Sequence, residues 1–389
     1  MSVFVNNAAS RWKMLALSYA GIVAFAVVFQ SVAPVLDLII AGASLTHGQA
    51  GGLMSFFALP GIIASLPAGI LADRFGARVV GTASLLLMTA GAALTAVGES
   101  YLPLAAGRMI AGAGAFALTV ALTRLISSWF AGKELGFAMG VFNTGMPLGT
   151  ILTLNTLGII GRTYGWQAAL HATTVISLIA LVVFFVAAKD PPASLSSVVD
   201  RGSQGFSFRR LGTGIWLAGL SWLWINAAGI SYLTFGTDYF LSLGSSPAAA
   251  GLLTSFLMMG SLFLSPIAGY MIDRGASQKT LIIVGSAMAS AIYLLIPGLP
   301  TYAYALTISL GIAAALIPVS IFSLPPRILP PAHVGAGFGI LSTCLNVGIL
   351  IGPCMVGIAR DMAGGYHVGF IMMAAFSLLS LASIALLRR

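Results

Sequence analysis

Long apolar runs, separated by short breaks of Gly, Pro or charged residues, follow one another from end to end of the chain. A helix needs about 20 mostly apolar residues to cross the roughly 30 Å hydrocarbon layer of a membrane, and each run is long enough. The pattern therefore predicts an all-α membrane protein with twelve transmembrane helices. They are expected at residues 13–41, 48–72, 79–98, 101–127, 136–160, 166–188, 211–241, 247–272, 280–297, 300–325, 334–358 and 367–387.

One polar stretch is much longer than the other breaks. It covers residues 189–210, is rich in Ser, and contains a Pro pair that stops the preceding helix. We interpret it as a linker, so the predicted organisation has three parts. These are an N-terminal six-helix bundle at 1–188, a cytoplasmic linker at 189–210 and a C-terminal six-helix bundle at 211–389.

The two halves share an internal repeat at a fixed offset of 200 residues. The repeated positions are Ala50, Gly51, Leu53, Ser55, Phe56, Ser65, Ala68, Gly69, Asp73 and Arg74, which recur as Ala250, Gly251, Leu253, Ser255, Phe256, Ser265, Ala268, Gly269, Asp273 and Arg274. Helices 5 and 11 share a second pattern, in which Asn143, Gly145 and Gly149 correspond to Asn346, Gly348 and Gly352. The repeat predicts two pseudo-symmetric six-helix bundles.

Composition and charge agree with a membrane protein. The chain is 59% hydrophobic and 7% charged, whereas a soluble chain is roughly a quarter charged. A net charge of +9 would indicate nucleic-acid binding only if the basic residues formed one surface. Here they lie in the breaks between apolar runs, so no nucleic-acid partner is expected. With the N-terminus inside, the outer segments hold only Arg162 and Arg360 among the lysines and arginines. We expect a multi-pass cell-membrane protein with both termini cytoplasmic.

Three stretches carry a family likeness: GILADRFGAR at 69–78, GYMIDR at 269–274 and RMIAGAGA at 108–115. The first resembles the signature loop after helix 2 of the major facilitator superfamily of transporters, and the second is a degraded copy after helix 8. The third resembles the helix 4 motif of proton-coupled members. The likeness covers essentially the whole chain, although Ala77 stands where the family commonly has a basic residue. It implies a secondary transporter.

Duplicated halves suit alternating access, in which a solute site near the membrane midplane opens to each side in turn. The loop motif is then expected to be a conformational latch, because a carboxylate near a helix N-terminus gains about 0.3 to 1 kcal/mol. Asp73 would face the start of helix 11, and Asp273 the start of helix 5. The plainer alternative is that these residues only mark the membrane edge. The predicted latch residues are Gly69, Asp73, Arg74, Gly76, Arg78, Gly269, Asp273 and Arg274.

Ionisable groups within the predicted helices are few, and such groups usually face a partner or a wet cavity. Arg108 is expected about a third of the way along helix 4, too deep to reach the membrane surface. Asp37 and Asp238 are expected near the outer ends of helices 1 and 7, where they could be simple interfacial residues. A pairing of Asp37 with Arg108, broken by protonation, could couple protons to transport.

Several polar side chains in the predicted helices are candidates for solute contact. Asn143 and Asn346 each place an amide in an apolar helix, where they either link helices or face the solute. The full candidate set is Arg108, Gln30, Tyr19, Asn143, Asn226, Tyr232, Tyr304 and Asn346. Packing or an interfacial place is the alternative for the aromatic members. His171 stands alone without ligand spacing, so we expect no metal site and no cofactor.

A membrane-embedded enzyme is the main rival, but its catalytic groups would have to gather at one depth, and the histidines are scattered. Because the deep charge is positive, we expect transport of an organic anion such as a carboxylate, coupled to protons. The alternative is proton-coupled export of amphipathic, drug-like compounds. Branches resembling nitrate porters usually carry arginines in helices 2 and 8, and those resembling oxalate-type exchangers carry basic residues in helices 8 and 11. This chain has none in any of these helices, which argues against both assignments. The expected partners are the small-molecule solute, protons and the lipid bilayer, around a monomer.

Overall fold

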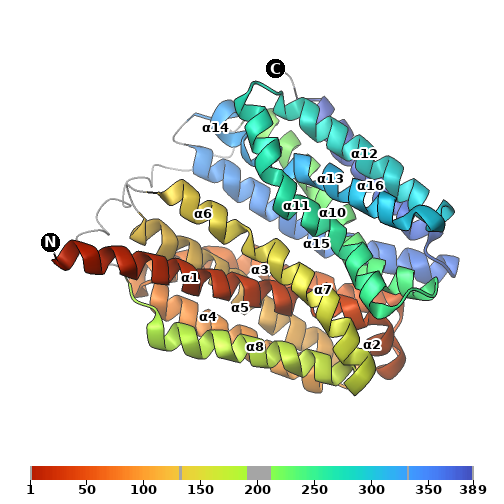
Figure 1. Cartoon of the computed structure of the whole chain (residues 1–389), viewed down its shortest axis with the longest axis horizontal. Coiled ribbons are helices and arrows are strands. Elements are labelled where there is room, and N and C mark those ends of the chain that lie inside the picture. Colours follow the sequence, from red (N-terminus) through yellow and green to blue (C-terminus); the bar gives the residue numbers. More distant parts are fainter. Residues whose placement is uncertain (1, 131–133, 191–211, 331–332, 388–389) are drawn as a thin grey trace. The chain divides into compact units, whose positions relative to one another are not determined.

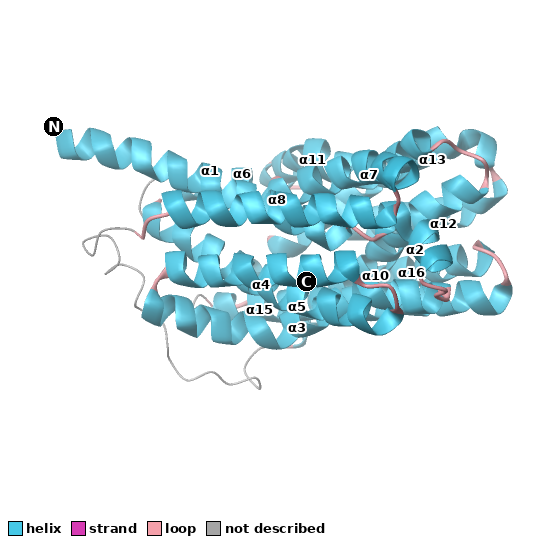
Figure 2. Cartoon of the chain, turned by 90° about the horizontal axis from the view of Figure 1, so that it is seen from below, coloured by secondary structure: helices cyan, strands magenta, loops and turns pink. Residues whose placement is uncertain are grey.

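The computed structural model describes residues 2–130, 134–190, 212–330 and 333–387. In this part of the chain the backbone forms helices joined by short turns, with no strand (Figure 2). The predicted linker falls almost entirely outside the described residues, from position 191 to 210, so its role stays a prediction. The division into domains at 188 and 211 likewise stays a proposal.

The helices group into two compact units, and the first is drawn from residues 1–31, 56–153 and 160–202. In it, α4 lies between α5 and α8, while α1 contacts α5 and α8 (Figure 1). Its helices are α1 (Ser2–Gln30), most of α3 (His47–Phe75), α4 (Ala77–Val97), α5 (Tyr101–Trp129), α6 (Leu135–Asn143), both ends of α7 (Gly145–Tyr164) and α8 (Trp166–Ala187).

The second unit is drawn from residues 32–55, 154–159 and 203–389. In it, α10 packs on α15 and α16, and α13 packs on α11 and α12. Short pieces from the first half of the sequence belong to it: η1 (Ala33–Val35), α2 (Leu36–Gly42), the first turns of α3 and the middle of α7. The remaining helices are α10 (Thr213–Ser242), α11 (Pro247–Asp273), α12 (Gln278–Gly298), η3 (Pro300–Tyr302), α13 (Ala303–Phe322), α14 (Pro325–Ile328), α15 (Val334–Ala363) and α16 (His367–Ala385).

The helices account for the twelve predicted spans. Ten spans in the described chain are long and apolar enough to cross a membrane, and α3, bent by 55° between His47–Ala64 and Pro67–Phe75, can supply an eleventh. Helix α10 is more polar, but its 30 residues are long enough to cross, and the side chains of Thr234, Thr237 and Asp238 near its end are buried. The sequence therefore predicted the helices well.

Two predicted spans are interrupted in the structure, which corrects their expected continuity. The first span stops at Gln30 and resumes as η1 and α2, because Pro34 has no N–H to donate to the carbonyl of Gln30. The fifth span breaks at Thr144, between α6 and α7, where Pro147 has the same effect on the carbonyl of Asn143. The interruption in the first span creates the surroundings of Arg108.

The repeat-related glycines at 51 and 251 mark close backbone contacts within the second unit. A Cβ added to Gly51 would overlap the carbonyl oxygen of Pro353 in α15, and one added to Gly251 would overlap that of Leu154 in α7. Only glycine permits helices to approach this closely. Next to the second contact, the Nδ2 of Asn155 donates to the Oγ of Ser255 at 3.2 Å.

Candidate functional site

Arg108 is the buried charge of the first unit. It lies in α5 and is 1% exposed, which makes it one of the largest fully buried side chains in the described residues. Its Nη1 donates to the carbonyl of Val28 and its Nη2 to that of Phe29, each at 2.7 Å. These carbonyls sit in the last turn of α1, where the helix breaks and regular backbone donors are missing. The Arg108 guanidinium thus donates to carbonyls that backbone N–H groups would satisfy in a continuous helix.

Aromatic rings surround the Arg108 side chain. Its guanidinium carbon lies 4.3 Å from the centre of the Phe57 ring, within the range of a cation–π contact. Phe57 in turn contacts Phe25, Phe29 and Phe116. In this conformation the Arg108 side chain is buried and has almost no surface to offer a solute. Any effect on a solute from this position is electrostatic.

The other predicted solute residues of the first unit lie near the breaks in its helices. Gln30 is the last residue of α1 and is buried. Tyr19 is half-buried, and its hydroxyl is 3.3 Å from the Oγ1 of Thr144 at the α6–α7 break. Asn143, the last residue of α6, is exposed. Tyr19 and Asn143 therefore offer accessible polar groups near one break.

The predicted residues of the second unit have more varied surroundings. Asn226 donates to the carbonyl of Trp222 in its own helix, and Tyr232 is fully buried with its hydroxyl donated to the carbonyl of Leu253. Tyr304 is half exposed at the start of α13. Asn346 is 5% exposed, and its Oδ1 has no hydrogen-bond partner among the described residues. Of these, Tyr232 is the least available to a solute.

The loop motif after α3 is held by two acidic groups of the first unit. Asp73 forms an ion pair with Arg124 of α5. Asp190 accepts the backbone N–H of Arg78 at 3.0 Å, while the Arg78 guanidinium donates to the carbonyl of Phe185 at 3.0 Å. The motif is thus tied to the ends of α5 and α8.

Gly76 is required by this geometry. Its φ is +86°, a conformation that side chains disfavour, and a Cβ there would lie 2.6 Å from Asp190. A side chain would strain the turn and displace the carboxylate at the start of α4. Gly69 is different, because a Cβ there would meet Val120 only at an ordinary 3.8 Å. In the second copy, Gly269 has a similarly loose contact, Asp273 is exposed, and the Arg274 guanidinium lies 4.9 Å from the Tyr270 ring.

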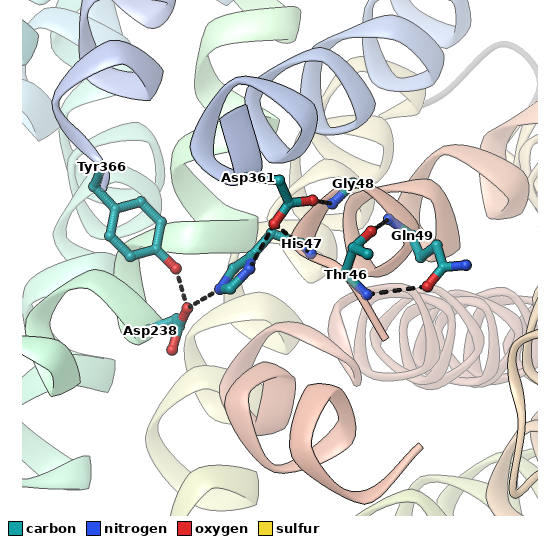
Figure 3. A network of polar contacts seen from close by, with 7 residues as sticks. All are labelled: Thr46, His47, Gly48, Gln49, Asp238, Asp361 and Tyr366. Atoms are coloured by element: carbon teal, nitrogen blue, oxygen red, sulfur yellow. Dashed lines mark hydrogen bonds and ion pairs between the residues drawn. The ribbon is translucent and has the colours of Figure 1, made fainter. Parts of the chain in front are cut away.

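A network of polar contacts in the second unit joins the ends of α3, α10 and α15 (Figure 3). We call it the His47 network, and it contains Thr46, His47, Gly48, Gln49, Asp238, Asp361 and Tyr366. Thr46 and Gln49 form a capping box, in which each side chain accepts the other's backbone N–H. The Asp361 carboxylate accepts the backbone N–H of His47 at 3.0 Å and that of Gly48 at 2.7 Å. The start of α3 therefore binds an anion from the end of α15.

The His47 ring lies between two carboxylates. Its Nδ1 is 3.0 Å from Asp361 Oδ1, and its Nε2 is 3.7 Å from Asp238 Oδ2. The hydroxyl of Tyr366 donates to the same oxygen of Asp238, as Figure 3 shows. Burial and the neighbouring Asp238 raise the pKa of the Tyr366 hydroxyl far above its ordinary value, so it remains a donor.

Sequence reasoning missed this network. It predicted Asp238 near an outer helix end, but it treated His47 as one of four scattered histidines and did not consider Asp361 or Tyr366. One local signal was present, because Thr46 and Gln49 have the spacing of a capping box. The contacts of Asp361 join positions 314 residues apart, which no local pattern can reveal.

Comparisons with known proteins agree with this architecture. The family described as Major Facilitator Superfamily matches residues 18–243 and 224–389. A nitrite extrusion protein of Bacillus subtilis (strain 168) is 23% identical over 340 residues, covering 86% of this chain and 84% of the relative. A hexuronate transporter of the same organism is 22% identical, covering 89% and 86%. The solved structure of a nucleoside transporter has a TM-score of 0.79 at 13% identity, covering 96% of this chain and all of that one. The structural likeness shows the fold alone.

Proposed function

The chain belongs to the major facilitator superfamily, and from this premise we propose that it moves a small organic anion across the cell membrane by alternating access. Transport of small solutes is the activity of the relatives, so an embedded enzyme is set aside. The observation that carries the choice of an anion is Arg108, a guanidinium in the membrane-spanning part of α5.

The charge of Arg108 can favour an anion without touching it. Two unit charges about 8 Å apart attract by roughly 2 kcal/mol at an effective dielectric constant of about 20, which is roughly a thirtyfold change in affinity. Hydrogen bonds to the neutral carbonyls of Val28 and Phe29 do not neutralise the guanidinium. The buried arginine can therefore select charge while other side chains provide direct contacts.

Two relatives support an anion by name, since nitrite and hexuronate are both negatively charged. The chain has no arginine at 48–72 or 247–272, the spans in which nitrate porters usually carry them. Basic residues are also absent at 334–358, where oxalate-type exchangers usually carry them, so the choice of a carboxylate rests on Arg108 and on the hexuronate transporter. The same relatives give less support to the export of amphipathic compounds.

For direct contacts we propose the polar side chains that keep accessible surface. Tyr19 and Asn143 lie near the α6–α7 break, and Asn226 is half-buried on α10. Hydroxyl and amide donors of this kind suit carboxylate oxygens. Asn346, with a buried amide oxygen that has no hydrogen-bond partner in the described residues, would orient a hydroxyl or amide elsewhere on the solute.

We further propose that both termini are cytoplasmic, that the transporter is a monomer, and that Asp37 and Arg108 couple transport to protons. The orientation rests on the distribution of lysine and arginine. In this orientation the loop motif containing Asp73 is the cytoplasmic latch, and the His47 network lies on the outside.

A thermal-shift screen tests the choice of solute. Purified protein is heated with carboxylates, with inorganic anions and with lipophilic cations, because a ligand at 100 times its Kd stabilises the folded state by about 2.7 kcal/mol. We expect a carboxylate to raise the melting temperature, with a smaller effect in Arg108→Lys. The control is Arg327→Lys, which changes an exposed arginine in the same way. Stabilisation by lipophilic cations alone would favour the export of drug-like compounds instead.

A further inference from the structure

The His47 network has more acidic than basic groups. Asp37 from α2 repels Asp238 on α10, while Arg360 and Asp361 come from the last turn of α15. The Arg360 guanidinium lies 5.4 Å from the centre of the Tyr366 ring. The other titratable neighbour from α10 is Tyr239, whose ring contacts that of Tyr366. The surroundings of the network thus include three carboxylates and one arginine, and His47 lies between two of the carboxylates.

We propose that His47 is a proton-binding site, and that its protonation clamps the end of α3 to the ends of α10 and α15. The proposal rests on the transport function and the orientation given above, which place the network at the outer surface. Its ligand is the proton of the external solution.

The geometry makes the network sensitive to one proton. A neutral imidazole has one N–H and one lone pair, so it donates to only one carboxylate and turns a lone pair towards the other. An imidazolium donates from both nitrogens, and here one nitrogen faces Asp361 and the other faces Asp238. Histidine is also the side chain whose ordinary charge change falls between pH 5 and 8.

The network joins the two repeats of the chain. Helix α3 belongs to the first repeat, whereas α10 and α15 belong to the second. In alternating access the outer ends of the repeats must separate, so these contacts must break when the outer side opens. A proton that strengthens them therefore favours the state that is closed to the outside. External acid is expected to hold the outer side shut.

The size of the effect follows from linkage. If closing the network changes the proton affinity of the site by a factor of ten, the ratio of closed to open molecules rises up to tenfold as pH falls through the transition. The stabilisation is present at low pH and is lost as pH rises. Without the proton, the backbone contacts of Asp361 remain, so the network weakens without vanishing.

Distance measurements test this directly. Spin labels are placed at Ala41 and Val368, both exposed, in protein lacking Cys344 and Cys354, and the distance distribution is recorded between pH 5.5 and 8 without any solute. We expect the short-distance population to grow severalfold as pH falls. His47→Gln should abolish this response, and the control His171→Gln, on the exposed side of α8, should keep it.

A pH response that persists in His47→Gln, or a wild-type distribution that does not change with pH, would overturn the proposal. If His47→Gln fails to fold, Asp361→Asn serves instead, because it removes one partner of the imidazolium and should move the midpoint to lower pH. An unchanged midpoint would count against the proposal. The measurement uses no solute, so it can fail while organic-anion transport holds, or succeed while that function fails.

Discussion

Removing the Arg108 side chain should destabilise the protein as well as alter transport. Arg108→Ala removes both donors. The carbonyl of Val28 still accepts from the Oγ of Ser31 at 2.9 Å, whereas that of Phe29 is left unsatisfied, which costs about 1 to 3 kcal/mol. Loss of the contact with Phe57 adds roughly 0.5 to 2 kcal/mol. The sum of about 1.5 to 5 kcal/mol is a large fraction of the total stability of many domains. Arg108→Lys should lose less stability, since the lysine ammonium keeps the positive charge and can donate a hydrogen bond to one of the two carbonyls.

The assay combines thermal unfolding with solute binding and gradient-driven uptake. We expect melting temperatures in the order wild type, Arg108→Lys, Arg108→Ala, with Arg327→Ala close to wild type because that side chain is exposed. If the charge holds an anionic solute, Arg108→Lys keeps part of the binding and Arg108→Ala loses it. If Arg108 instead tunes Asp37, Arg108→Ala keeps affinity but loses proton-driven accumulation. An Arg108→Ala protein as stable as wild type would refute the role of these carbonyl contacts.

Three further predictions concern topology and the loops that we propose to be cytoplasmic. Single cysteines at Ser197 and Ser100 should label from opposite sides of the membrane, and labelling from one side would contradict the two-half topology. Asp73→Asn should weaken closure on the proposed cytoplasmic side and shift the population towards the inward-facing state, about fivefold for a contact of about 1 kcal/mol. Asp273→Asn should have a smaller effect, and unchanged distances between spin labels on these loops would contradict the prediction. Asp190→Ala should lower stability by about 1 kcal/mol through the start of α4, and an unchanged denaturant midpoint would exclude that role.

The sequence predicted the helices because hydrophobic length and breaks are local properties. The span predicted at 101–127 corresponds to α5 at Tyr101–Trp129, and that predicted at 247–272 to α11 at Pro247–Asp273. The interruptions at Gln30 and Thr144 were less visible, since a proline in an apolar run can either bend a helix or end it. Pro353 shows the other outcome, because α15 continues through it.

The candidate sites were only partly predictable. Arg108 was identified because a charge in an apolar helix is conspicuous, but its carbonyl partners depend on how α1 ends and which helix lies beside it. Asp73 was expected to act at a helix start, and within the first unit it pairs with Arg124, a contact of side chains from two helices. The His47 network depends on helix ends that meet from distant parts of the chain. Such contacts follow from tertiary packing alone.

Uptake of a radiolabelled carboxylate into proteoliposomes tests the central claim, transport of an organic anion, most directly. We predict saturable uptake that is absent from protein-free vesicles, is inhibited by unlabelled carboxylates, and increases when an inward proton gradient is imposed. A neutral amide analogue of the same solute should compete at least tenfold less well, because it lacks the charge that Arg108 favours. Equal competition by the amide, or uptake only of lipophilic cations, would contradict the account.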